Sequence, residues 1–241
     1  MTAFVLAYGE DRIPYQVSYD DARKTRVAIH VNPDGSVAVD APLGFSDESI
    51  KQAVQKRARW VVGHVSEARE RYAQVRPREY VSGEQVLYLG RRYMLKVIPV
   101  DRKPAPARLR GNRLEVETTN GLEDDIKGRL RAWYLVRGRD YLSRRIDVLA
   151  KTLPWVDAPP PFRLLEMSRQ WGSCSPSGEL IINRHLVKVP RQCVDYVLIH
   201  ELAHLKHHDH GPEFWNLIDA HAGDWRKAKR HLDGLVEVSL D

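Results

Sequence analysis

Residues 196–205, Tyr-Val-Leu-Ile-His-Glu-Leu-Ala-His-Leu, place three ionisable side chains in a segment that is otherwise apolar or aromatic. A helix formed by this segment is hydrophobic on nearly every side, so we expect it to be buried. His200 and His204 are four residues apart, just over one helical turn, and therefore project from the same face. Buried ionisable groups are costly unless they are paired or neutralised. The segment thus predicts a buried helix whose His200, Glu201 and His204 contact an ion or a partner.

The spacing H-E-x-x-H is typical of zinc peptidases, in which both histidines bind Zn²⁺ and the glutamate acts as general base. A tetrahedral zinc site of this kind needs a third protein ligand and an open position for water. His207 cannot supply that ligand from an unbroken helix, because it would lie about 10 Å along the axis from His200. We therefore expect the chain to turn after about Lys206.

Two residues are candidates for the third ligand. His210 follows the expected turn and precedes Gly211-Pro212, and proline suits the first position of a new helix. Glu213 is the alternative, because a zinc site can also take a carboxylate from a following helix. Imidazole is the commoner ligand in such clusters, so His210 is favoured. His207 and His208 are expected to be exposed turn residues.

Alternating apolar patterns and turn signals predict an α+β fold. The predicted strands are residues 1–8, 26–31, 37–41, 86–89, 93–98, 113–117, 164–171 and 179–182, and the predicted helices are 46–68, 122–149 and the segment after Pro190. Strand pairs followed by a helix occur twice. We expect a β-rich N-terminal region with one helix, 1–120, and a C-terminal region, 121–241, whose motif helix packs on a small sheet, or one continuous domain.

Composition narrows the class of protein. Apolar residues make up 43% and charged residues 29% of the 241-residue chain, as in ordinary globular proteins. Two cysteines cannot form a disulfide framework, and no apolar run approaches the roughly eighteen residues of a membrane span. The first eight residues resemble a strand more than a signal peptide. We expect a cytoplasmic protein that does not insert into membranes.

The last third of the chain resembles one known family. The residues that carry the resemblance are Arg169-Gln-Trp-Gly-Ser-Cys174, Ile182-Asn183, Leu186, Pro190, Asp195-Tyr196, the H-E-L-A-H core and His210-Gly-Pro-Glu-Phe-Trp215. They are similar to the YgjP-like metallopeptidases, relatives of the SprT-like and WLM zinc proteases of the gluzincin class. The close similarity spans about 171–215. Gln170 departs from the family pattern, in which arginine directly precedes the tryptophan, and puts a role for Arg169 in doubt.

The resemblance implies a zincin-like metallopeptidase domain with one Zn²⁺ per chain. It implies His200, His204 and His210 as zinc ligands and Glu201 as the catalytic residue. The implied activity is that of an endopeptidase, in which Glu201 activates a zinc-bound water to hydrolyse a protein or peptide substrate. By analogy with the fold, the strand at 179–182, or the strand before Trp171, would line the cleft and pair with extended substrate.

Several further residues have open roles. An oxyanion stabiliser besides zinc is usual, and its candidates are Tyr196, His221 and Arg169. A Cys174 thiolate near zinc could act as a redox or inhibitory ligand, although a small packed cysteine is the commoner case. Asp219 and Asp224 could orient a ligand imidazole, or could cap helices or face solvent.

An alternative function is a nucleic-acid-associated zinc protein. The net charge of +6 permits contact with nucleic acid. The predicted helix 122–149 carries a basic side formed by Arg129, Arg131, Arg137, Arg139, Arg144 and Arg145. The SprT-like relatives act on DNA–protein crosslinks, so such a protein could be a protease of DNA-bound substrates. A solvated helix surface is the simpler explanation of these arginines.

Overall fold

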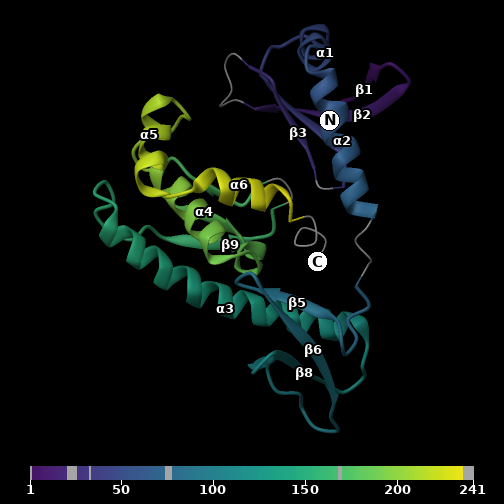
Figure 1. Cartoon of the computed structure of the whole chain (residues 1–241), viewed down its shortest axis with the longest axis vertical. Coiled ribbons are helices and arrows are strands. Elements are labelled where there is room, and N and C mark those ends of the chain that lie inside the picture. Colours follow the sequence, from purple (N-terminus) through teal and green to yellow (C-terminus); the bar gives the residue numbers. More distant parts are fainter. Residues whose placement is uncertain (1, 21–25, 33, 74–77, 168–169, 236–241) are drawn as a thin grey trace. The chain divides into compact units, whose positions relative to one another are not determined.

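The chain folds into two compact units, residues 1–76 and 77–239. The computed structural model describes residues 2–20, 26–32, 34–73, 78–167 and 170–235. The secondary structure is α+β, as the sequence predicts, and Figure 1 shows its elements along the chain. Among the described residues, no helix combines the length and apolar character needed to cross a membrane.

The first unit is a four-stranded sheet covered by two helices. The strands β1 (Thr2–Tyr8), β2 (Asp11–Asp20), β3 (Ala28–Val31) and β4 (Val37–Pro42) lie in the order β1-β2-β4-β3. Before β4, Gly35 adopts a φ of +79° and donates its N–H to the Asn32 carbonyl. β3 and β4 therefore pair as an antiparallel hairpin, as the alternating pattern predicts.

Two helices replace the single helix predicted at 46–68. α1 (Asp47–Gln55) begins after Ser46, whose hydroxyl caps the N–H of Ser49, and α2 is Ala58–Ala73. The apolar positions that predicted the helix are all buried in the core of this unit: Ile50, Val54, Val61 and Val65. The hydrophobic spacing thus gave the buried face correctly and missed the break at residues 56–57.

The second unit begins with a sheet of the same topology. The strands β5 (Gln85–Tyr88), β6 (Arg91–Pro99), β7 (Arg108–Arg110) and β8 (Arg113–Thr118) lie in the order β5-β6-β8-β7. In both sheets two antiparallel hairpins join through a central parallel pair, and a helix follows. The repeated strand pairs noted in the sequence therefore correspond to a repeated strand order.

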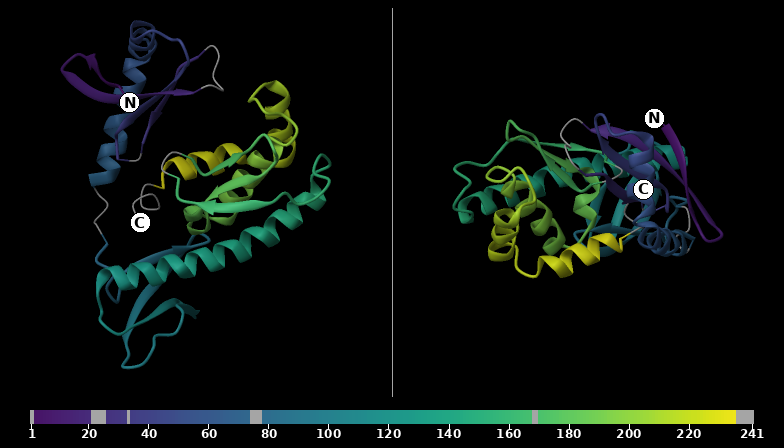
Figure 2. Two further views of the ribbon diagram at one scale, coloured as in Figure 1. Left: turned by 180° about the vertical axis from the view of Figure 1, so that it is seen from behind. Right: turned by 90° about the horizontal axis from the view of Figure 1, so that it is seen from above.

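The 30-residue helix α3 (Glu123–Thr152) follows this sheet and extends along the second unit (Figures 1 and 2). Gly138 of α3 faces Leu164 and Val187, since a Cβ at this position would lie 3.5 Å and 3.4 Å from their side chains, an ordinary van der Waals distance. The Tyr134 hydroxyl donates a 2.6 Å hydrogen bond to the Leu87 carbonyl at β5. α3 thus joins the β5–β8 sheet to the C-terminal elements.

A second, three-stranded sheet supports the motif helix. β9 (Phe162–Leu165), β10 (Gly172–Cys174) and β11 (Leu180–Asn183) lie in the order β10-β11-β9. The strand predicted at 164–171 is present only at its start, because β9 ends at Leu165; residues 168–169 of the prediction lie outside the described part of the chain. Met167 and Gln170 lie outside the strand, and their carbonyls accept hydrogen bonds from the Asn183 side-chain amide. β10, which lies outside the predicted strands, pairs with β11 as an antiparallel hairpin.

The chain then continues through the 3-10 helix η1 (Arg184–Lys188) and the helices α4 (Arg191–Ala203), α5 (Pro212–His221) and α6 (Trp225–Asp233). The turn between β5 and β6 packs directly on this segment. Leu89 and Gly90 donate backbone hydrogen bonds to Val187 and Lys188, and a Cβ at Gly90 would lie 2.7 Å from the Pro190 Cα. The expected boundary near residue 120 therefore falls inside the second unit, since the β5–β8 sheet shares its core with the motif helix.

Candidate active site

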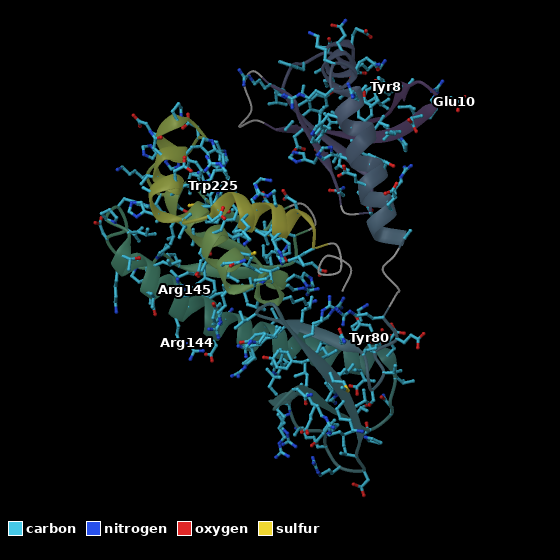
Figure 3. The ribbon with its side chains drawn as sticks, in the orientation of Figure 1. Tyr8, Glu10, Tyr80, Arg144, Arg145 and Trp225 are labelled. Atoms are coloured by element: carbon cyan, nitrogen blue, oxygen red, sulfur yellow. The ribbon has the colours of Figure 1, made fainter. Side chains whose placement is uncertain are left out.

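The motif helix α4 is buried on almost all sides, as its apolar composition predicts. Val194, Leu198 and Leu202 have no exposed surface, and Glu201 is 5% exposed. α4 is tied to α3 by an ion pair in which the Arg145 guanidinium donates to both oxygens of Asp195, one at 3.0 Å. Arg145 projects from α3 (Figure 3). The helix that carries the motif is thus held rigidly within the unit.

The turn expected after the motif is present and brings a third histidine to the first two. α4 ends at Ala203, whose carbonyl accepts the N–H groups of Lys206 and His207. The chain reverses, and α5 begins at Pro212 in the first helical position. His210 precedes this helix, and its Nε2 lies 3.1 Å from the His200 Nε2.

His200, His204 and His210 form a single cluster of metal-ligating type. One nitrogen from each imidazole lies within 4.8 Å of the others. Phe214, from the first turn of α5, is fully buried and contacts all three rings, with centroid distances of 4.9, 4.6 and 4.7 Å. Phe214 therefore packs against the imidazole of each histidine in the cluster.

The cluster favours neutral imidazoles. Burial first, and then the neighbouring His204 and His210, lower the pKa of His200 to about 3. Burial also lowers the pKa of His204 and of His210. The His204 Nδ1 lies 3.0 Å from the His207 carbonyl, which can only accept, so Nδ1 carries the proton and Nε2 keeps its lone pair. Neutral imidazole with a free lone pair is the form that binds metal ions.

The three imidazoles fit a zinc ion. Two nitrogens that each lie about 2.0–2.1 Å from a tetrahedral Zn²⁺ are about 3.3 Å apart, close to the 3.1 Å between His200 and His210. Among the residues that the structure describes, none is a hydrogen-bond partner of the buried Nδ1 of His200, so internal hydrogen bonds do not satisfy every imidazole nitrogen of the cluster. A donor set of three neutral imidazoles is also the one found in catalytic zinc sites.

Glu201 lies against the backbone of β10. A Cβ added to Gly172 would lie 2.7 Å from both Cγ and Oε1 of Glu201, so only glycine allows this approach. Burial raises the pKa of Glu201 to about 8. Burial, and then the proximity of Glu201, raise the pKa of the Cys174 thiol. The close approach of Gly172 to Glu201 was not predicted, because the only sequence signal at this position is a segment rich in glycine and serine.

The alternative third ligand lies elsewhere. Glu213 has a largely exposed side chain, and its carboxylate lies 3.6 Å from His207 Nδ1. Among the described residues, Glu213 is not part of the histidine cluster. His208 is exposed, as expected, whereas His207 is half-buried. The structure therefore brings His210, and not Glu213, to His200 and His204.

The candidate oxyanion stabilisers and Cys174 lie in different places. Tyr196 is buried beside the cluster, with its ring 6.0 Å from that of His200, and burial raises its pKa to about 12. His221 packs against Trp155 instead, and Arg169 lies outside the described residues. Cys174 lies half-buried in β10.

Two aspartates have structural contacts. Asp224 caps α6 by accepting the N–H of Lys227, and Asp219 accepts from Trp225 Nε1 at 2.7 Å and pairs with Arg226. Trp225, at the start of α6 (Figure 3), stacks on Trp215 and Tyr196. These contacts account for both aspartates without an interaction with the histidines.

Several arginines on the basic side of α3 form ion pairs with aspartates of the same protein. Arg129 pairs with Asp125, Arg144 with Asp140, and Arg145 with Asp195. Half of the six arginines thus have acidic partners within the protein. The surface left for a polyanion on this helix is correspondingly smaller, and contact with nucleic acid stays a prediction.

Comparison with known proteins gives one family. The model of the YgjP-like metallopeptidase domain matches residues 25–234, which include the histidine cluster and Glu201. Searches of curated proteins and of solved structures gave no match. Members of a metallopeptidase family hydrolyse peptide substrates with a metal ion, typically zinc. Because the matched region covers most of the 241 residues, the chain belongs to the YgjP-like metallopeptidase family.

Proposed function

We propose that His200, His204 and His210 hold one Zn²⁺ and that Glu201 is the general base in the hydrolysis of internal peptide bonds. The observation that carries this proposal is the convergence of three imidazole nitrogens within 4.8 Å on the helix that carries a buried carboxylate. A purely structural metal site has no need of a carboxylate next to its first ligand. The arrangement therefore favours a catalytic centre.

When bound, Zn²⁺ polarises the substrate carbonyl and lowers the pKa of water in its open position toward 7. Glu201 accepts the proton of the attacking water and then donates it to the nitrogen of the leaving amine. Both transfers are efficient when the carboxyl pKa lies near the working pH. The pKa of about 8 that burial gives Glu201 supports this double role, and a nearby cation would lower that pKa toward neutrality.

The neighbouring strand supports a substrate bound in extended form. β11, which contains most of the strand expected to pair with substrate, lies between β10 and β9 and has partners on both sides. β10 occupies the edge of this sheet, and its Gly172 contacts Glu201. An edge strand offers backbone donors and acceptors to an added peptide strand. We therefore assign substrate pairing to β10 in place of β11.

Pairing along an edge strand lets a polypeptide extend past the catalytic carboxylate in both directions, which favours cleavage of internal bonds. The test is to incubate the zinc-loaded protein with an unfolded protein and to map the products by mass spectrometry. We expect internal cleavage that a chelator abolishes and added zinc restores. Absence of cleavage, cleavage that survives chelation, or release of terminal residues only would overturn the proposal.

A further inference from the structure

A stack of aromatic rings from three helices lies beside the histidine cluster. Trp215 of α5 stacks on Trp225 of α6, with ring centroids 5.0 Å apart and an angle of 22° between the ring planes. Trp225 also stacks on Tyr196 of α4, at 5.9 Å and 14°. The Trp215 ring lies 5.8 Å from the His210 ring and 6.2 Å from the His200 ring. Trp215 therefore lies next to two of the three histidines.

Trp225, the ring that both stacked pairs share, is fixed by polar contacts. It is 9% exposed, and its indole N–H donates a 2.7 Å hydrogen bond to Asp219. The Arg226 guanidinium lies 4.4 Å from the Trp225 ring centroid and donates to the same carboxylate at 2.8 Å. These contacts tie α5 to α6 and give Trp215 a rigid surface to pack on.

Trp215 differs from Trp225 in its contact with solvent. It is half-buried, and among the described residues none accepts a hydrogen bond from its indole N–H. The indole nitrogen is also not one of the buried polar atoms without a partner, so it reaches solvent. Tryptophan is enriched at binding interfaces, where part of the ring packs and another part meets water. One part of Trp215 thus packs in the stack, and another part is available to a ligand.

The open side of the histidine cluster is the side on which Trp215 lies. His210 is the exposed member of the cluster, whereas His200 and His204 are half-buried. A substrate that arrives from solvent therefore approaches past His210, whose ring is the closer of the two histidines to Trp215. An extended peptide rises about 3.3 Å per residue. The side chains next to a peptide bond held at the cluster thus come within reach of Trp215.

We propose that Trp215 determines specificity by forming one wall of the subsite for an aromatic or large aliphatic side chain next to the cleaved bond. This inference rests on the proposed peptidase function. An aromatic side chain packs favourably against an indole ring, and a large aliphatic side chain removes apolar surface from water when it covers that ring. A small or charged side chain gains neither contribution, so it should be cleaved less efficiently.

The test compares peptides that span one cleaved bond, mapped first in an unfolded protein by the zinc-loaded wild type. Each residue that flanks the bond is varied in turn among phenylalanine, leucine, alanine and glutamate. At one of the two positions, we expect kcat/KM to be at least about tenfold higher with phenylalanine or leucine than with alanine. Trp215→Ala should reduce that ratio to within about threefold of unity, and Trp215→Phe should restore most of it.

Trp60→Ala is the matched control, because it removes a tryptophan that is 41% exposed on α2 in the first unit. Its preference ratio should equal that of the wild type, and all variants should keep the wild-type zinc content. The inference is overturned by a wild type without the preference, by the same ratio in Trp215→Ala and the wild type, or by equal loss of the ratio in Trp60→Ala.

A second measurement needs no cleavage and decides the inference if Trp215→Ala does not fold. The phenylalanine peptide is added to zinc-loaded Glu201→Gln protein, and the indole N–H resonances are followed by NMR. The Trp215 resonance, assigned by its absence from the spectrum of Glu201→Gln/Trp215→Phe, should shift more with this peptide than with the alanine peptide. An unmoved resonance contradicts the contact. Failure of the wild type to cleave any peptide would instead contradict the proposed function, and the NMR result would then decide the role of Trp215.

Discussion

Gly172 of β10 lies so close to the Glu201 carboxylate that a single methyl group at position 172 would fall 2.7 Å from Cγ and Oε1 of that side chain. The two residues are 29 positions apart in sequence, and the fold brings them together. One contact thus couples the edge strand that we assign to substrate with the carboxylate that we assign to proton transfer. Its disruption should affect catalysis more than metal binding.

Gly172→Ala should lower kcat/KM by at least about tenfold, because the added methyl group displaces the Glu201 carboxylate and because overpacking of a tight contact costs about 1–3 kcal/mol. Zinc content should stay at the wild-type level. Gly128→Ala is the matched control, since a Cβ at that helical glycine meets nothing within 4 Å. A Gly172→Ala enzyme with the kcat/KM of the wild type would show that the contact is not catalytically important.

His210→Ala should weaken zinc binding by more than about 100-fold, because loss of a direct ligand exceeds the tenfold to 100-fold effect of losing a residue that only orients one. Glu213→Ala should retain zinc, since Glu213 lies against His207. Zinc is measured by atomic absorption after dialysis against a competing chelator. Retention of zinc by the histidine variant and its loss from the glutamate variant would reverse the ligand assignment.

Arg145→Met should lower the free energy of unfolding by about 1–2 kcal/mol, because it breaks a partly buried pair in which both Asp195 oxygens accept hydrogen bonds. The adjacent Arg144 pairs with Asp140 at 3.6 Å, and both side chains are largely exposed. Arg144→Met should therefore cost no more than about 0.5 kcal/mol. Urea denaturation of the two variants gives the comparison, and equal costs would refute the role of Asp195 in docking α4 on α3.

His185 should make the protein less stable in acid. Its pKa falls from 6.5 to about 3 on folding, so the native state binds fewer protons than the unfolded state between these values. The contribution of this group to stability is present above pH 6.5 and is lost as the pH falls toward 3. His185→Gln should reduce the slope of unfolding free energy against pH in that window, by up to about 1.4 kcal/mol per pH unit. The measurement is chemical denaturation in phosphate-free buffer, and identical slopes for both proteins would count against a buried neutral His185.

The histidine cluster could largely be predicted from the sequence, because it is formed by residues that lie close together along the chain. The spacing of His200 and His204 follows from one helical turn, and the length of a helix excludes His207 and requires a turn. Pro212 marks where the next helix begins, which places His210 in the turn before it. Sequence alone left Glu213 open, since it is three residues further on and is a chemically suitable ligand. The packing of Phe214 against the three rings distinguishes the two.

Most of the features that the sequence prediction missed depend on contacts between distant residues. β2 is an exception: it was not among the predicted strands, although Ile13, Tyr15 and Val17 alternate and are buried, and a short turn after Tyr8 pairs it with β1. Gly172 lies outside the predicted strands because its neighbours are small and polar, whereas pairing with Ile182 makes it part of a strand. The packing of Gly90 on Pro190 places the β5–β8 sheet with the motif helix α4. That contact joins residues that the expected boundary near residue 120 would separate.

The central claim is that Glu201 transfers the proton in a zinc-dependent hydrolysis. Its most direct test compares the wild type with Glu201→Gln for zinc content and for the rate of cleavage of an unfolded protein. Glutamine preserves the size of the buried side chain and removes the base, so we expect about one zinc per chain in both proteins and a loss of cleavage in the variant alone. A Glu201→Gln protein that binds zinc and cleaves at the wild-type rate would contradict the account.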